Sequence, residues 1–580
     1  MRRAIILVAC AVVTAALAAP AQAGPTATTS ADGTAAEYVV LYKDGVSLEK
    51  AHAAIRAAGG TIVRENTDVG LATVRSTRAA FGADARRQPA VEGVARDRAV
   101  GEAPKVTHRA ADKNIAVEKE GRDGGTRTAG RDGGSRATTA KVKGDPLAGS
   151  QWDMRKIHAT ADGSYRVEPG DRGVRVGVID TGIDGNHPDI RANFDRGLSR
   201  NFTKDIPVDA NGTEVDGSCE HPSCVDPVDE DDNEHGTHVA STIASPLNGL
   251  GMAGVAPNVT LVNIRAGQDS GYFFLQPVVD ALTYAGDAGI DVVNMSFYTD
   301  PWLFNCPDNP ADSAEYQAEQ RTVIAASERA LAYAHRHGVT LVSAAGNGAT
   351  DYTKTIVDDS SPDYAAKPGE APYSRTIPPS CISEPSEGRN VISVSSVGIS
   401  GRKAYYSDYG NGYVDVAAPG GDVYDTADGK RDVTKGILAA YPESLARARG
   451  ELNADGTPNV PYVVRDCKGT TCGYYQYLQG TSMASPHAAG VAALIVSRYG
   501  HRDPRHGGLT LSPDVVQRIM QGTATEQPCP SPRDFTYTRY VLQPDGTYQK
   551  VTATHTCEGS TRHNGFFGSG VVDALHAVGR

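Results

Sequence analysis

The sequence lacks three features that would assign it to common functional classes. Beyond the first 23 residues, no apolar run approaches the roughly 20 residues of a membrane helix, so no stable membrane insertion is expected. The net charge is −12, which argues against a nucleic-acid partner. The zinc-protease motif His-Glu-x-x-His is also absent, so metalloprotease chemistry has little support.

The N-terminus has the features of an export signal. Arg2-Arg3 precedes an apolar stretch from Ala4 to Ala19, and Ala21-Gln22-Ala23 has small residues at the spacing of a cleavage site. We therefore expect a signal peptide over residues 1–23 and a secreted, extracellular protein. Leu7 to Cys10 resembles a lipoprotein box, but the apolar stretch continues well past Cys10, so lipidation is the weaker alternative.

Cysteine usage agrees with export. Nine cysteines are present, and loss of the signal peptide leaves eight, an even count that indicates disulfide bonds in an exported chain. Eight cysteines allow about 105 pairings. Zinc is a rival for the close pairs, although neither pair is a Cys-x-x-Cys with a matching second half. The expected pairs are Cys219–Cys224, Cys467–Cys472, Cys306–Cys381 and Cys529–Cys557.

Residues 37–94 have the pattern of a small α+β unit. Strand-like and helix-like stretches follow one another in the order β-α-β-β-α-β, which is typical of a ferredoxin-like fold. Gly59-Gly60 is expected to end the first helix. The expected elements are a strand from Glu37, a helix at Leu48–Ala58, strands at Thr61–Val63 and Gly70–Val74, a helix near Arg78–Arg87 and a strand near Val91–Val94.

Residues 102–144 differ in composition from the segments on either side. They contain a nine-residue near-repeat at 121–129 and 130–138, they are dominated by Gly, Arg, Thr and Ala, and large apolar residues are scarce. This composition indicates a flexible linker, and an exposed flexible linker is where proteolysis is easiest.

From Asp145 onward, short apolar runs alternate with helix-like stretches. This alternation is typical of a mainly parallel sheet with helices on both faces, in which functional residues gather at the carboxyl ends of the strands. Strands are expected at Arg175–Asp180, Val259–Arg265, Asp291–Ser296, Thr340–Ala344 and Val391–Ser395, and helices at Gly236–Ile243, Leu275–Ala288 and Thr322–His337.

Three polar residues stand at the ends of such elements. Asp180 closes a strand, His235 stands at the start of one helix, and Ser482 starts another. A serine hydroxyl is a poor nucleophile until a base removes its proton, and a histidine can do so near neutral pH. A carboxylate then fixes the imidazole tautomer and stabilises the imidazolium. The sequence therefore contains the residue types of nucleophilic catalysis, each placed where it can reach a cleft.

Each residue also has a purely structural interpretation. An Asp before Thr-Gly is often a turn or cap residue, which applies to Asp180. His235 and His238 have the i, i+3 spacing of a metal pair or of simple packing. Ser482 could cap a helix, because Pro486 falls within the next turn.

The motifs around these residues decide between the interpretations. VIDTGI (178–183), HGTHVA (235–240) and GTSMASPHAAG (480–490) stand in the order Asp, His, Ser, which is the order in subtilisin. Together with AAGN (344–347), they resemble the subtilisin-like serine proteases, over about residues 145–580. The resemblance implies an α/β fold with a mainly parallel, seven-stranded type of sheet flanked by helices, preceded by the small ferredoxin-like unit.

The resemblance also implies residue roles. Asp180 orients the imidazole, His235 is general base and acid, and Ser482 is the nucleophile. Asn347 donates its side-chain amide to the oxyanion together with the Ser482 backbone N–H, although Gly346 and Gly348 would also suit a simple Gly-Asn-Gly turn. The expected substrate-binding residues are Ser296, Phe297, Ala345 and Gly346.

Two positions depart from the family pattern. Phe297-Tyr298 stands where Leu-Gly is usual, which changes the expected rim of the substrate pocket. Glu234 replaces a usual Gly directly before His235, and its carboxylate is expected to raise the imidazole pKa. Relative to a minimal family member, the segments at about 203–232, 298–320, 349–385 and 421–475 are inserted.

The resemblance completes the expected organisation. Residues 24–101 would be an inhibitory propeptide, 102–144 a linker that contains the maturation site, and 145–580 the catalytic domain. The expected protein is a monomeric zymogen that acts on peptide or protein substrates and is inhibited by its own propeptide. Catalysis needs no cofactor; calcium is expected only for stability, with Asp189 or the acidic segment at 226–232 as candidates.

Two alternative functions share this chain's features. A maturation enzyme that favours transpeptidation would use the same triad, and product analysis with added amine nucleophiles would identify it. A non-catalytic peptide-binding member would have a damaged triad or oxyanion residue, and none of these residues is replaced here.

Overall fold

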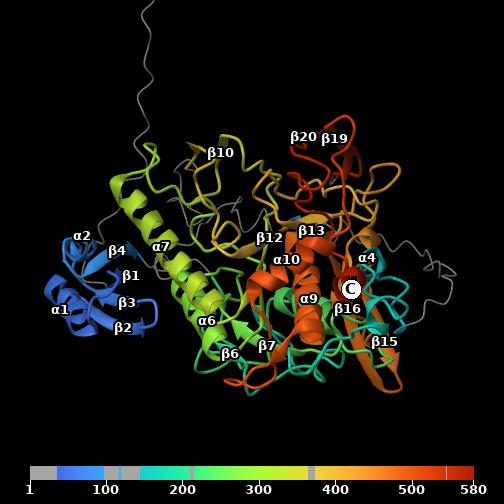
Figure 1. The fold of residues 1–580 in the computed structure, drawn as a ribbon, viewed down its shortest axis with the longest axis horizontal. Coiled ribbons are helices and arrows are strands. Elements are labelled where there is room, and N and C mark those ends of the chain that lie inside the picture. Colours follow the sequence, from blue (N-terminus) through green and yellow to red (C-terminus); the bar gives the residue numbers. More distant parts are fainter. Residues whose placement is uncertain are drawn as a thin grey trace, which may run out of the picture.

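The computed structural model describes residues 35–96, 117–118, 144–208, 215–362, 373–543 and 545–579. The predicted signal peptide and nearly all of the predicted linker, with its maturation site, lie outside the described residues. Figure 1 shows a small N-terminal unit, in blue, beside a larger body that carries the remaining elements.

The N-terminal unit has the predicted order of elements. Its four strands pair antiparallel in the order β2-β3-β1-β4, which is the ferredoxin-like arrangement. The first helix ends as expected, because Gly59 adopts a left-handed φ of 88° that a residue with a side chain rarely takes. The elements are β1 (Ala36–Tyr42), α1 (Leu48–Ala58), β2 (Thr61–Asn66), β3 (Leu71–Ser76), α2 (Phe81–Arg86) and β4 (Val91–Arg96).

The larger body is built on a seven-stranded sheet in the order β13-β12-β9-β8-β5-β7-β6. Every neighbouring pair of strands is parallel, as the apolar runs predict. The two edge strands, β6 and β13, were not predicted, and β6 has only two residues. The strands are β5 (Arg175–Ile179), β6 (Arg200–Asn201), β7 (Thr260–Arg265), β8 (Val292–Met295), β9 (Thr340–Ala344), β12 (Val391–Val397) and β13 (Val416–Pro419).

Helices cover both faces of this sheet. Val178 of β5 belongs to the core that packs against α5, α9, α10 and α11, while the next residue, Ile179, belongs to the core against α6 and α7. Successive strand residues point to opposite faces, so both faces are buried. The helices are α4 (Trp152–Lys156), α5 (His235–Ala244), α6 (Leu275–Asp287), α7 (Ala314–Arg336), α8 (Glu443–Ala448), α9 (Thr481–Tyr499), α10 (Pro513–Thr523) and α11 (Ala574–Val578), with 3₁₀ turns η2 (Ser164–Arg166) and η3 (Val433–Lys435).

Helix α7 corrects one prediction. It begins at Ala314, within a segment that was expected to be an inserted loop, rather than near Thr322. Ser313 caps the helix by accepting a hydrogen bond from the backbone N–H of Tyr316. Ala, Glu and Gln, which are good helix formers, then fill the first turns.

Small additional sheets surround the body, and those at 356–377 and 437–478 come from inserted segments. Two of the four disulfides lie within inserted segments at short range, and all four sulfur pairs are those expected from the sequence. The added strands are β10 (Ile356–Asp358), β11 (Arg375–Ile377), β14 (Ile437–Ala440), β15 (Val463–Lys468), β16 (Thr471–Leu478), β17 (His501–Arg502), β18 (Leu509–Thr510), β19 (Asp534–Leu542) and β20 (Tyr548–Thr556).

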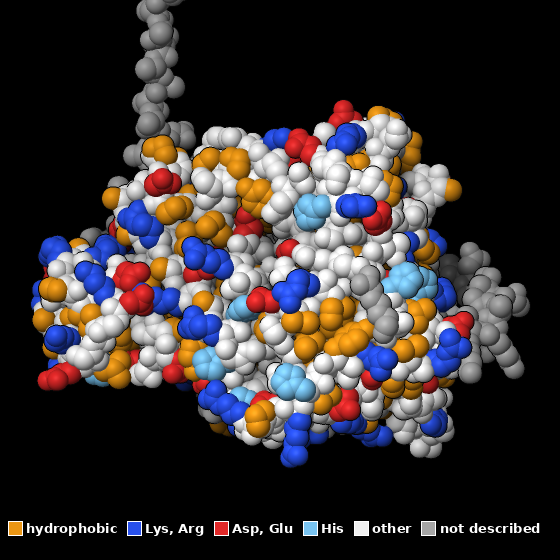
Figure 2. Space-filling model, in the orientation of Figure 1, with side chains coloured by type: hydrophobic (Ala, Val, Ile, Leu, Met, Phe, Trp, Pro, Cys, Tyr) orange, Lys and Arg blue, Asp and Glu red, His pale blue; other side chains and the backbone are white. Residues whose placement is uncertain are grey.

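The N-terminal unit packs against α6 and α7 through its sheet (Figure 1). Val39, Leu41 and Leu71 join the same apolar core as these two helices. At the edge of this contact, Asn66 donates to Asp280 at 2.8 Å. On the face in Figure 2, basic and acidic side chains are interspersed over both parts, so neither sign of charge dominates that face.

Candidate functional site

Three elements converge on one cleft of the larger body. Asp180 directly follows β5, His235 is the first residue of α5, and Ser482 is the second residue of α9. The cleft is lined by both His235 and Ser482, with Asp180 fully buried behind the histidine. Gly480, and not Ser482, is the N-cap of α9, so the serine hydroxyl is not used as a helix cap.

Asp180 and His235 form a hydrogen-bonded pair. The distance from His235 Nδ1 to Asp180 Oδ1 is 2.7 Å, and the backbone N–H of Thr181 donates to the same carboxylate oxygen at 2.8 Å. Because a carboxylate can only accept, the proton of the neutral ring is on Nδ1. The other ring nitrogen, Nε2, is therefore left as a base that faces the cleft.

The charge environment of His235 favours its protonated form. Burial by itself would lower the imidazole pKa, but the negative charges of Asp180 and Glu118 raise it well above its ordinary value. Glu234 was expected to contribute, yet its buried carboxylate is ion-paired with Arg449. Glu234 also has a left-handed φ of 87°, which gives a physical reason for the usual glycine at this position.

His238 is a core histidine. Its Nε2 lies 3.1 Å from the carbonyl oxygen of Ile437, and burial lowers its pKa to about 3. The ring therefore stays neutral and contacts a different part of the molecule from His235. The two histidines do not share a metal site despite their i, i+3 spacing.

Asn347 lies at the mouth of the same cleft. Its side-chain carbonyl accepts hydrogen bonds from the backbone N–H and the hydroxyl of Thr481, each at 2.9 Å. The amide Nδ2 therefore faces the cleft, where it donates to Glu118 at 3.4 Å. The Thr481 hydroxyl also accepts from the Gly346 backbone N–H at 3.1 Å, which holds the loop after β9 against the start of α9.

Glu118 contacts the predicted catalytic residues but was not itself predicted from the sequence. The Ser482 hydroxyl donates to its Oε1 at 2.6 Å, and its Oε2 lies 3.6 Å from His235 Nε2. The neighbouring backbone is held by Gln479, whose side chain donates to the Val117 carbonyl at 3.0 Å. A short apolar run, Ile115–Val117, within the polar linker is the only signal in the sequence that could have indicated this segment.

Comparison with known families agrees with this geometry. The model of the subtilase family, peptidase family S8, matches residues 171–570. The chain belongs to the subtilase family. Its relatives include the thermophilic serine proteinase of Bacillus sp. strain AK1, which is 29% identical over 58% of this chain and 55% of the relative. Subtilisin DY of Bacillus licheniformis is 28% identical over 61% of this chain and 84% of that protein. The chain thus spans about half the length of the first of these relatives.

Solved structures agree on the subtilase fold. The epidermin leader peptide processing serine protease of Staphylococcus aureus is 19% identical, with a TM-score of 0.57 over 94% of this chain and 98% of that chain. Fervidolysin of Fervidobacterium pennivorans is 20% identical, with a TM-score of 0.52 over 94% of this chain and 61% of its own. Within the described ranges, no helix of this subtilase is long and apolar enough to cross a membrane.

The substrate cleft of the subtilase is partly aromatic. The Phe297 ring stacks on Phe273, with 4.1 Å between ring centroids and 4° between planes. Tyr298 lies beside it in the wall. The Ser296 hydroxyl is turned away toward α9, where it donates to the Ser482 carbonyl at 3.1 Å. Ala345 and Gly346 line the same cleft, so all four expected substrate-binding residues lie at it.

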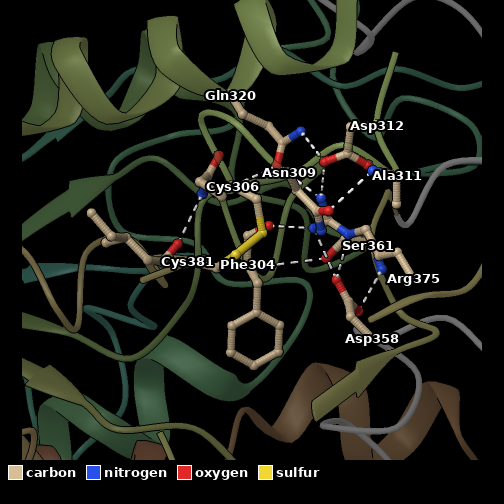
Figure 3. The surroundings of a disulfide bond; sticks show 12 residues. Phe304, Cys306, Asn309, Ala311, Asp312, Gln320, Asp358, Ser361, Arg375 and Cys381 are labelled. Carbon is tan, nitrogen blue, oxygen red and sulfur yellow. Dashed lines mark hydrogen bonds and ion pairs between the residues drawn. A yellow bond between two sulfur atoms is a disulfide. The ribbon is translucent and has the colours of Figure 1, made fainter. Parts of the chain in front are cut away.

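Inserted segments complete the cleft. Leu303, Ser383 and Ser386 line it from two inserts that are far apart in sequence. Figure 3 shows how these inserts are joined, by the Cys306–Cys381 disulfide and by the buried Arg375. The Arg375 guanidinium is fully buried and pairs with the carboxylates of Asp312 and Asp358, together with several further acceptors shown there.

Asp189, the calcium candidate taken from the family motif, has protein donors at both carboxylate oxygens. Oδ1 accepts from the Asn248 side chain at 2.9 Å, and Oδ2 accepts from the Met252 backbone at 3.0 Å and from the Tyr475 hydroxyl at 3.0 Å. Burial raises the pKa of Asp189 to about 7.

Proposed function

We propose that this subtilase is a secreted serine endopeptidase that is made as a latent precursor. The observation that carries the proposal is the convergence of Asp180, His235 and Ser482, with the Asn347 amide facing the same cleft. An intact triad beside an amide donor also argues against the alternative of a non-catalytic peptide-binding protein.

Catalysis would proceed through an acyl-enzyme. The Ser482 hydroxyl oxygen attacks the scissile carbonyl carbon while His235 Nε2 takes its proton, and Asp180 stabilises the imidazolium. The tetrahedral intermediate collapses, and the leaving amine receives the proton from Nε2. Water then attacks the ester with His235 again as base, which releases the acid product and restores the serine.

The negative charge of the tetrahedral oxygen would be stabilised at the start of α9. The Asn347 amide donates from one side and the Ser482 backbone N–H from the other. The first N–H groups of α9 and the positive end of its dipole would point toward this oxygen as well. Donors fixed before the reaction stabilise the transition state without reorganisation.

The cleft suits an extended peptide with an apolar side chain at the cleaved position. A substrate backbone would pair as an added strand with the segment after β8, which begins at Ser296. Its side chain would enter between Phe297, Leu303 and Ala345. Primary selectivity for apolar residues is therefore part of the proposal.

Latency would be due to the segment that contains Glu118. Its carboxylate accepts from the Ser482 hydroxyl and from the Asn347 amide, so it occupies the place of the developing oxyanion. While it does so, the serine proton is directed to Glu118 rather than to His235. The N-terminal unit, packed on α6 and α7, would hold this segment in place until the linker is cut.

The first test is the intact mass and N-terminal sequence of the secreted protein, compared between wild type and Ser482→Ala. Ser497→Ala, which changes a serine at the far end of the same helix, is the matched control. We expect wild type and the control to lose their first hundred-odd residues and Ser482→Ala to remain at precursor length. Identical trimming of all three would mean that another protease performs maturation and would remove this support for Ser482.

The mature enzyme obtained in this way also tests whether transpeptidation is favoured over hydrolysis. Mature enzyme incubated with a peptide substrate and an added amine nucleophile should release mainly the free acid. A majority of amide product would favour the maturation or transpeptidating alternative.

A further inference from the structure

Glu234 places a carboxylate beside the catalytic histidine. It is the N-cap residue of α5, whose first residue is His235, and it lines the same cleft with only 1% of its surface exposed. An ionised carboxylate close to an imidazole favours the protonated ring, and a protonated ring cannot take the proton of a serine. An uncompensated charge at Glu234 would therefore oppose the role of His235 as a base.

The turn before α5 fixes the place from which the Glu234 side chain leaves the backbone. Glu234 has a left-handed φ of 87°, and its backbone N–H donates to Asp231 Oδ1 at 3.2 Å. The other carboxylate oxygen of Asp231 accepts from the backbone N–H of Thr237 at 2.9 Å, so the turn is tied to the start of α5. A residue with a side chain keeps a left-handed conformation only where its surroundings hold it. The Glu234 carboxylate is thus presented at a fixed place next to His235.

Arg449 supplies the opposite charge from the insert at 421–475. Its guanidinium pairs with the Glu234 carboxylate and also donates to the Tyr441 hydroxyl at 3.0 Å. The Tyr441 hydroxyl in turn donates to the carboxylate of Glu451 at 2.8 Å. Apart from Glu234, these residues all belong to the insert, so the insert holds the guanidinium in position against the wall of the cleft.

The burial of this pair distinguishes it from an ordinary surface ion pair. The side chain of Glu234 is 1% exposed and that of Arg449 is 30% exposed, whereas the nearby pair of Arg447 and Glu443 is about half exposed at both residues. An exposed pair contributes little, because water screens it. Removal of one partner from a buried pair instead leaves an uncompensated charge. Loss of Arg449 should therefore change the electrostatic surroundings of the adjacent histidine, and loss of Arg447 should not.

The surroundings of His235 already carry negative charge. Asp180 Oδ1 lies 2.7 Å from its Nδ1, and Glu118 Oε2 lies 3.6 Å from its Nε2. His238, on the same helix, stays neutral because burial lowers its pKa to about 3, so it does not offset these charges. An unpaired carboxylate at the N-cap of α5 would add to them.

We infer that Arg449 is a positioning residue that acts through Glu234: it offsets the carboxylate beside His235, so that the imidazole stays available as the base. The inference rests on the proposed protease function. It gives the insert at 421–475 a part in catalysis, although the insert supplies none of the triad. A residue without a carboxylate at position 234 would make the arginine unnecessary, which the experiment can test.

The experiment compares Arg449→Met with the matched control Arg447→Met and with the double variant Glu234→Gln/Arg449→Met, in which the carboxylate is removed as well. The kcat/KM of each mature enzyme is measured across a pH series, because its acid limb reports the pKa of the base in the free enzyme. NMR titration of His235 in Ser482→Ala precursors with the same substitutions gives the pKa without activity. The same spectra show whether each variant is folded.

We expect the acid limb of Arg449→Met to move to higher pH by about half a unit or more, which is about a threefold or greater loss of kcat/KM on the acidic side. Arg447→Met should keep the wild-type limb, and the double variant should return to it. The pKa of His235 should follow the same order in the precursors. An unmoved limb in Arg449→Met, an equal loss at every pH, or a limb that stays displaced in the double variant would overturn the inference.

If Arg449→Met does not fold, Glu234→Gln alone decides the question. It leaves the guanidinium charge uncompensated, so the acid limb should move to lower pH, and an unchanged or higher limb would overturn the inference. An inactive wild-type enzyme would instead contradict the proposed function, so the two failures are distinguishable.

Discussion

The side-chain carbonyl of Asn347 accepts two hydrogen bonds from Thr481, one from the backbone N–H and one from the hydroxyl, each at 2.9 Å. This relationship fixes which end of the Asn347 amide faces the cleft. It also couples the loop after β9 to the first turn of α9, so the side-chain donor and the serine are positioned together.

Replacement of Asn347 by Ala should lower kcat by about 10²–10³ and leave KM nearly unchanged. The magnitude is the one known for loss of this donor in subtilisin. Loss of the Asn347 amide affects kcat because its hydrogen bond forms with negative charge that exists only in the transition state. Steady-state kinetics of the mature enzyme on a chromogenic peptide measure it, with Asn459→Ala, an exposed asparagine, as control. Equal losses in both variants would contradict the oxyanion role.

The Thr481→Val variant tests whether Thr481 acts by positioning Asn347. The variant keeps the backbone N–H that donates to Asn347 and loses the hydroxyl. We expect a fall in kcat of about tenfold, because a typical hydrogen bond contributes about 0.5–1.5 kcal/mol. Combination with Asn347→Ala should add little further loss, since Thr481 acts through Asn347. Fully additive losses would show that Thr481 has a separate role.

Asp180→Asn should lower kcat by about 10⁴ at neutral pH while the protein remains folded. The amide is close in shape to the carboxylate, but it favours the wrong imidazole tautomer and does not stabilise the imidazolium. Kinetics together with a thermal unfolding curve test this. A loss below tenfold would mean that Asp180 acts mainly as the turn residue that its Thr-Gly context allows.

Glu118→Ala should speed maturation of the precursor by about ten- to a hundredfold. Hydrogen bonds to a charged group contribute about 1.5–3 kcal/mol, and this variant removes those that hold the carboxylate at Ser482 and Asn347. Pulse-chase measurement of precursor conversion gives the rate. Glu120→Ala removes a charge from the same segment and serves as control. Unchanged conversion in Glu118→Ala would contradict the proposed role of Glu118 in latency.

The contact between Glu118 and His235 predicts a pH dependence. Negative charge from Asp180 and Glu118 outweighs burial and raises the pKa of His235 well above 6.5. The stabilisation from Glu118 is therefore fully present below pH 6.5 and is lost as pH rises through the raised pKa, when His235 loses its proton. In Glu118→Gln the pKa should move down, which NMR titration of His235 in the Ser482→Ala precursor would measure. An unchanged or higher pKa would contradict the contact.

Arg375→Met should lower the free energy of unfolding by about 3–5 kcal/mol, because it leaves the buried carboxylates of Asp312 and Asp358 uncompensated. Arg389→Met, at a side chain that is 85% exposed, should change the free energy of unfolding by less than about 0.5 kcal/mol. Urea unfolding of the Ser482→Ala protein measures both. Similar values for the two variants would show that the carboxylates find other partners.

The sequence predicted the features that depend on local patterns. The helix at Leu48–Ala58 agrees with the structure residue for residue, because amphipathic spacing and Gly59 define both of its ends. Runs of buried apolar residues likewise marked the central strands, and Asp180, His235 and Ser482 were found from motifs at element ends.

Features that depend on distant contacts could not be predicted in this way. Glu118 contacts Ser482, which lies 364 residues later in the chain, and no local pattern specifies such a contact. The buried Arg375 is an ordinary charged residue in the sequence, and only the meeting of two inserts removes it from water. The start of α7 was missed because the segment was assigned by comparison with a smaller relative rather than by its own helix-forming residues.

The inserts around Cys306 and Cys381 have a small apolar core of their own, formed by Phe304, Tyr352, Ile377 and the disulfide itself. They contribute Leu303 and Ser383 to the cleft but none of the strands of the central sheet. The rim of the pocket is therefore a structural unit distinct from the central sheet. The two inserts could be exchanged together between subtilases to change which side chain is accepted, while the framework that performs the chemistry stays the same.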